Sequence, residues 1–162
     1  MDHEHALDIH ILADGSEERR QPWVITDGHE RLTGAHSGGV CVHAEASFEV
    51  ARRGRLSGSL SLQPGSSARI AGQHAGSLHV GAGAVAEVVG DQSGSVHVED
   101  GGLVKVHPGG KLAGSLHVAG LVENRGIRGG PVQVSGGVVE DLDGGSVKQP
   151  TKGPRGENVY RW

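Results

Sequence analysis

The chain has 162 residues, including 29 glycines but only two Trp, one Tyr and one Phe, and its formal net charge is −4. A wide globular core is not expected, because such a core relies on large side chains, whereas a thin solenoid can be filled by Val, Leu, Ile and Ala. The charged residues form no cluster of lysines and arginines that would hold phosphates, so nucleic acid is not an expected partner.

The segment Met1–His5 has neither a positively charged start nor an apolar stretch, and no run approaches the roughly 20 apolar residues of a membrane-spanning helix. Cys41 is the only cysteine, which rules out a disulfide within the chain and a zinc site built from cysteines. A single thiol also suits a reducing compartment. We therefore expect a soluble, cytoplasmic protein without a membrane span.

Residues 1–36 do not fit the repeat that follows them. Leu7, Ile9 and Ile11 alternate with polar residues, which predicts a half-buried strand, and the segment 23–25 could supply a second one. The end of a solenoid exposes an open sheet edge that must be covered. We therefore interpret residues 1–36 as an N-terminal cap segment.

The chain repeats itself from Gly54 onward. Nine-residue units of the form Gly-x-x-x-Gly-x-[Leu/Val]-x-[Leu/Val] begin at Gly54, Gly72, Gly90 and Gly110, with spacings of 18, 18 and 20 residues between their first glycines. A period of this length indicates a short unit that must stack on its copies to bury its apolar face. The sequence therefore predicts a solenoid.

Apolar residues fall at matching even-numbered positions in successive coils, and alternation would place all of them on one inward face. They are Val40, Val42, Phe48, Val50; Leu60, Leu62, Ala68, Ile70; Leu78, Val80, Ala86, Val88; and Val96, Val98, Val104, Val106. A fifth coil begins near Gly114 and a less regular sixth near residues 132–134. The prediction is an all-β chain, with a single-stranded parallel β-helix of about six coils over residues 37–147, two strands to each coil.

Residues 148–162 break the pattern and carry the Pro and Gly typical of a flexible linker. This tail ends in Tyr160, Arg161 and Trp162, residue types that are favoured at binding hot spots. Two interpretations are open: an interaction tail that docks on this protein or a partner, or a frayed terminus.

At the Gly-x-x-x-Gly units, beside runs such as residues 68–72 and 87–90, the chain resembles the bactofilins over residues 37–130. These are bacterial cytoskeletal proteins built as compact right-handed parallel β-helices. The resemblance implies assembly into filaments through the ends of the β-helix, without a nucleotide, and service as a scaffold for other proteins. It implies no cofactor.

His79, His97 and His117 occupy one strand position in successive coils, which predicts an outward ladder of imidazoles above Ser61 and Cys41. Histidine is a common ligand for transition metals, but neighbours in a row point in parallel and no carboxylate or thiolate completes a site. We therefore expect a solvated ladder without a bound metal.

Two rows of glycines recur at fixed offsets and are interpreted as structural corners, where the chain needs a left-handed conformation or where coils stack too closely for a Cβ. One row holds Gly58, Gly76, Gly94 and Gly114, and the other holds Gly72, Gly90 and Gly110. Between the rows, His74 and Gln92 share the even parity of the core. They would be buried and mutually bonded if the strand continued through the corner, but the flanking glycines favour a surface position.

Catalysis finds little support, since the carboxylate pairs 99–100 and 140–141 lie at expected turns and no nucleophile or zinc motif occurs. A hexapeptide-repeat acyltransferase would need an aliphatic residue at every sixth position, and series such as Leu60, Ser66 and Gly72 break that rule in every register. We expect a non-enzymatic scaffold that self-associates, bactofilin-like, into a homo-oligomer or filament. The alternatives are a β-helix module or inhibitor that binds one protein partner and, third, an acyltransferase-like enzyme.

Overall fold

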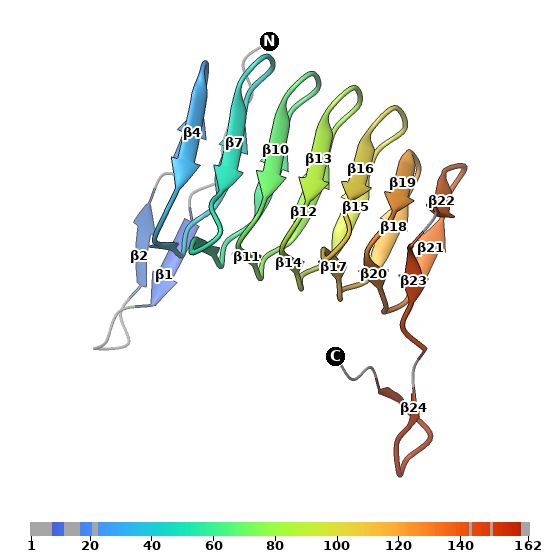
Figure 1. Ribbon diagram of the computed structural model, residues 1–162. Coiled ribbons are helices and arrows are strands. Elements are labelled where there is room, and N and C mark those ends of the chain that lie inside the picture. The colour runs from blue at the N-terminus through green and yellow to red at the C-terminus, as the bar shows by residue number, and fades with distance from the viewer. Residues whose placement is uncertain (1–7, 12–16, 21–22, 143, 150, 160–162) are drawn as a thin grey trace.

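The computed structural model describes residues 8–11, 17–20, 23–142, 144–149 and 151–159. Every regular element in these ranges is a β-strand, and the strands wind into a parallel β-solenoid (Figure 1). The predicted fold class is therefore confirmed. Among these residues the structure contains no helix that is long and apolar enough to cross a membrane.

Each turn contributes one strand to each of three seven-stranded parallel sheets. The first sheet holds β3 (Trp23–Ile25), β6 (Val40–Val42), β9 (Leu60–Leu62), β12 (Leu78–Val80), β15 (Val96–Val98), β18 (Leu116–Val118) and β21 (Val132–Val134). The second holds β4 (His29–Leu32), β7 (Ser47–Val50), β10 (Ser67–Ile70), β13 (Val85–Val88), β16 (Leu103–Val106), β19 (Leu121–Asn124) and β22 (Val138–Asp141). The third holds β5 (Ala35–His36), β8 (Arg55–Leu56), β11 (Gln73–His74), β14 (Asp91–Gln92), β17 (Lys111–Leu112), β20 (Ile127–Arg128) and β23 (Ser146–Val147).

The stack has seven turns, one more than expected, because the segment from Trp23 to His36 forms a complete first turn. Trp23–Ile25 was expected as a covering strand, yet it pairs in parallel with β6 as part of the first sheet. The strands β4 and β5 pair in the same way with β7 and β8. Each turn also has a third, two-residue strand between the glycine rows, where the sequence predicted only two strands per coil.

The core is a narrow column of aliphatic side chains. From β6 to β19 the even-numbered residues of the strands point inward as predicted, and Leu60, Leu78, Val96 and Leu116 are each fully buried in one row of the first sheet. Alternation within a strand explains this, because successive side chains point to opposite faces. One aromatic ring, Phe48, lies in the core of the second turn.

The outer face of the second sheet carries a row of charges that alternates in sign. In register, Arg31, Glu49, Arg69, Glu87, Lys105 and Glu123 follow one another from turn to turn. Ion pairs connect Arg31 with Glu49 at 3.5 Å and Arg69 with Glu87 at 3.6 Å. Opposite charges on neighbouring strands favour this register over a slipped one.

The corner between the first and second sheets contains a left-handed residue in every turn except the sixth. In the third, fourth and fifth turns this residue is Gly65, Gly83 or Gly101, with φ values of 83°, 73° and 86°. In the second turn the residue is Glu45, whose φ is 67° although it has a Cβ. These glycines are therefore conformational, and they are distinct from the two glycine rows predicted from the sequence.

Two antiparallel hairpins flank the stack. At the N-terminus β1 (Asp8–Ile11) pairs with β2 (Glu17–Arg20), and the two form a sheet of their own. At the C-terminus β24 (Thr151–Lys152) pairs with β25 (Asn158–Val159), within the segment that was expected to be a linker. Tyr160, Arg161 and Trp162 lie outside the described residues.

Candidate functional site

The three ladder histidines stack face to face on the outside of the first sheet. In register, His79 pairs with His97 and His97 with His117, one turn apart. Their ring centroids are 4.8 and 4.6 Å apart, with interplanar angles of 9° and 4°. Ser61 and Cys41 precede them in the same row and Gln133 follows them. The strand register alone produces this geometry, because one residue type recurs at one strand position.

The middle imidazole is the least free to take up a proton. Burial lowers the pKa of His97, and positive charge on His79 and His117 would lower it further. Ser95 adds a polar contact, with its Oγ 3.3 Å from His97 Nε2. His97 is therefore uncharged at neutral pH, and it lies between the stacked rings of His79 and His117.

A single metal ion does not fit between these rings as they stand. Zinc lies about 2.0–2.1 Å from a histidine nitrogen, whereas parallel rings more than 4.5 Å apart hold matching nitrogens at a similar separation. Within the described ranges, no group of three or more His, Cys, Asp or Glu side chains is arranged to hold a metal. Cys41 is buried in the same row, and burial raises the pKa of its thiol.

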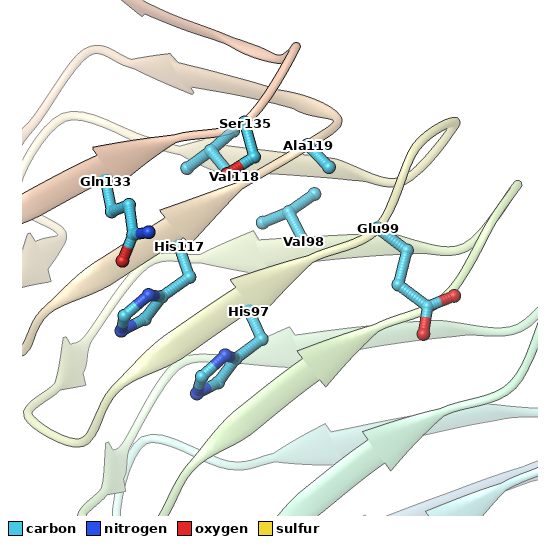
Figure 2. Close-up of a pocket in the computed structure, with 8 residues that line it drawn as sticks. All are labelled: His97, Val98, Glu99, His117, Val118, Ala119, Gln133 and Ser135. Carbon is cyan, nitrogen blue, oxygen red and sulfur yellow. The ribbon is translucent and has the colours of Figure 1, made fainter.

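A shallow depression of about 240 Å³ lies beside the last rungs of the ladder (Figure 2). His97, His117, Gln133 and Glu99 contribute to its lining. Figure 2 shows the two imidazoles side by side, with the Glu99 carboxylate away from them beyond Val98. The carboxylate is therefore not placed to act on a group held by the imidazoles.

We expect the ladder to make stability depend on pH. A folded-state pKa below the unfolded value of about 6.5 means that the unfolded chain binds more protons, so stability falls as pH drops below about 6.5. The loss ends once the folded state is protonated as well. Replacing His79, His97 and His117 by Ser should flatten this dependence in urea unfolding measured between pH 7 and 5. Parallel losses in the wild type and the triple variant would show that the ladder is not the cause.

Both predicted glycine rows lie where one turn rests on the next. A Cβ on Gly76 would overlap the carbonyl oxygen of Gly58, and a Cβ on Gly94 or Gly114 would overlap the carbonyl of the preceding glycine in the row. In the other row, Gly72, Gly90 and Gly110 would likewise meet backbone carbonyl oxygens. None of these seven glycines has a positive φ, so close stacking explains them and left-handed geometry does not.

His74 and Gln92 are buried, and the preference for a surface position was wrong. Both side chains have no exposed area, because β11 and β14 carry the alternation through the corner that the glycines were expected to break. His74 Nδ1 lies 2.6 Å from Gln92 Oε1, and its Nε2 lies 2.8 Å from the carbonyl oxygen of Gly58. Gln92 Nε2 donates to the carbonyls of Gly76 and Gly94, at 3.0 and 3.2 Å. Burial lowers the pKa of His74. The contacts of its ring with the Gly58 carbonyl and with Gln92 raise that pKa, but burial has the larger effect.

The C-terminal end of the stack is apolar and open, a feature that the sequence analysis missed. Val132 and Val134 continue the inward rows of Leu116 and Val118, which are buried, yet they are 40% and 49% exposed. Val147, which continues the row of Leu112 and Arg128 in the third sheet, is 38% exposed. The available signal was the position of these valines in the last coil, since an inward side chain there has no further turn to cover it.

Polar side chains close the remaining corner of this end. Buried Asn124 donates from Nδ2 to Asp141 Oδ1 at 2.9 Å and to the carbonyl of Ser146 at 3.1 Å. Arg128 donates to both carboxylate oxygens of Asp141, at 2.9 and 2.8 Å, and thereby lowers the pKa of Asp141. The open end is thus an apolar patch of valines beside a satisfied polar cluster.

The first turn differs from the last. Its inward residues Ile25 and Leu32 are only 2% and 8% exposed, and the Trp23 ring packs edge-to-face against Phe48 with centroids 5.3 Å apart. Glu30 lies in the inward row of Phe48 but is exposed. A charge at an inward position of an edge strand discourages pairing with another chain. The two ends of the solenoid are therefore not equivalent.

A scan against protein-family models, a search of curated proteins and a search of solved structures each found no match for this chain.

Proposed function

We propose that this chain is a structural, non-enzymatic protein of bactofilin type that self-associates through an end of its solenoid. The observation that carries the proposal is the open C-terminal end. There β21, β22 and β23 are the outermost strands of the three sheets, and the valines beside them are exposed. Unpaired edges and uncovered apolar side chains both favour a further layer of chain.

The contact joins the C-terminal ends of two copies. The first turn offers a poor partner for the valine patch, because Ile25 and Leu32 are already covered and Glu30 would bring a charge to it. A second C-terminal end brings the same valines and the same free strand edges. Fully burying a valine-sized side chain contributes about 1.5 kcal/mol, so several of them give a measurable affinity.

Sedimentation velocity on the full chain, from about one to one hundred micromolar, tests this proposal. We expect a concentration-dependent shift from monomer to larger species. Val134→Glu places a charge in the patch and should raise the dissociation constant at least about tenfold, which corresponds to about 1.4 kcal/mol.

Gln133→Glu is the matched control, because it adds the same charge to the same strand on its outer face. It should associate as the unmodified chain does. If the unmodified chain and the control stay monomeric over the whole range, self-association through this end is refuted.

A second candidate function is a module that binds one protein partner. The observation that favours it is an apolar row on the outer face of the second sheet, formed by Val85, Leu103, Leu121 and Val138. The last three also line a groove of about 400 Å³ whose floor is largely glycine. A chain that remains monomeric but retains a partner protein through this row would support the module and not the scaffold.

A further inference from the structure

We propose that the C-terminal tripeptide Tyr160–Arg161–Trp162 covers the open end of its own chain and competes there with a second copy. The proposal rests on the open end that carries the proposed function. It adds a regulator of that end, and it decides between the two interpretations that the sequence left open for this tripeptide.

The C-terminal hairpin returns the chain to the end of the stack. Thr151 pairs with Val159, so Val159 lies level with the start of the hairpin. Thr151 follows Val147, the last residue of β23, by only four positions, which span at most about 14 Å when extended. The chain therefore returns at Val159 to within reach of the valine patch, and Tyr160, the next residue, is thirteen positions after Val147.

The chemistry of the patch suits aromatic side chains. Val132, Val134 and Val147 are partly exposed around the uncovered column, and among the described residues no further turn covers them. Tyr and Trp bury a large area at small cost in conformational entropy, with a polar edge that can remain in water. The rings of Tyr160 and Trp162 are large enough to cover the exposed faces of these three valines.

Charge also favours the tripeptide. Glu140 stands next to Glu123 in the outer row of the second sheet, where the alternation of sign ends. Glu123 pairs with Arg125 at 3.7 Å, whereas Glu140 forms no ion pair with any residue in the described ranges. Arg161 lies between the two aromatic residues and supplies the missing positive charge. Electrostatic complementarity of this kind guides which surface a segment selects.

The first test compares association of the full chain with that of the Tyr160→Ser/Trp162→Ser variant by sedimentation velocity. Removing the rings should lower the apparent dissociation constant about a hundredfold, because both ends that meet must be free and the tripeptide would leave each of them free about one-tenth of the time. Arg155→Ser, an exposed change in the turn of the same hairpin, is the control and should leave association unchanged. Equal association of the full chain and the double variant overturns the proposal but leaves the proposed function intact.

The second test detects docking in the monomer. The chain is labelled with 5-fluorotryptophan, the signal of Trp162 is assigned with Trp162→Phe, and its 19F shift is recorded at low micromolar concentration. Val134→Glu should move this signal to the shift of a free peptide of the same tail, whereas Gln133→Glu should not. A Trp162 signal at the free-peptide position in the unmodified chain overturns the proposal. A docked Trp162 signal in a chain that never associates supports docking of the tripeptide on the open end and refutes only the proposed function.

Discussion

Gly94→Ala is expected to destabilise the protein by about 3 kcal/mol, although it adds a single methyl group. A Cβ at this position would overlap the carbonyl oxygen and carbon of Gly76 and approach the Ala75 carbonyl oxygen at 2.6 Å. Backbone on both sides is tied into the sheets, so the turns must separate to make room. Overpacking of this kind costs about 1–3 kcal/mol or more.

Gly34→Ala is the matched control for this prediction. No atom lies within 4 Å of the position where its Cβ would stand, and its φ is not positive. Alanine should therefore leave stability unchanged or raise it slightly, by restricting the unfolded chain. Urea unfolding of both variants measures the difference. Equal stabilities of Gly94→Ala and Gly34→Ala would contradict the close stacking of turns.

A double-mutant cycle on the buried polar pair should give the second large effect. Gln92→Leu alone leaves His74 Nδ1 buried without its partner, which should cost about 2 kcal/mol. His74→Leu/Gln92→Leu removes both polar groups, and the neighbours in the same row are already leucines, Leu56 and Leu112. The double variant should therefore be within about 1 kcal/mol of the wild type, since replacing both partners by apolar groups is nearly neutral.

The coupling energy of this cycle is the quantity to measure. A value of at least about 1 kcal/mol is expected for two groups in direct contact. The double variant should also lose the part of the pH dependence that comes from His74, because burial lowers the pKa of that ring. Additive effects of the two single changes would show that the pair is not bonded in solution.

The sequence predicted the middle of the stack well because local and global signals agree there. Residues such as Leu78 and Val80 alternate with polar neighbours, recur at a fixed period and are flanked by glycines that only tight stacking explains. Each of these features predicts that the same side chains point inward. The even-numbered core positions of the predicted coils are consequently buried in the structure.

The edges of the repeat were harder to predict. The glycine unit that joins the first turn to the second, Gly34-Ala-His-Ser-Gly38-Gly-Val-Cys-Val42, was not recognised in the sequence. Trp23–Ile25 was therefore interpreted as a cover, although its register with Val40–Val42 makes it a strand of the first sheet. His74 and Gln92 were misplaced for a related reason. The flanking glycines were expected to break the alternation of inward and outward side chains at this corner. Instead they let neighbouring turns stack closely, and the alternation continues through the corner.

The candidate site could be predicted only in part, because the histidine ladder follows from the sequence pattern whereas the valine patch does not. The histidine ladder follows from recurrence at one strand position, and the structure places its rings in a stack. The valine patch exists because the described part of the chain forms no eighth turn. Val132 and Val134 resemble core residues in sequence, and only their place in the last turn exposes them.

Distances between spin labels on associated copies test the central claim most directly. In a Cys41→Ser background, one label replaces Glu140 in the last turn and, in a separate sample, another replaces Arg31 in the first turn of the same outer row. Seven turns at about 4.8 Å per spacing make each stack about 29 Å tall. Contact between C-terminal ends predicts a distance below about 30 Å for the Glu140 label and about 60 Å for the Arg31 label. A short distance for the Arg31 label, or no intermolecular distance for either, would contradict association through the open end.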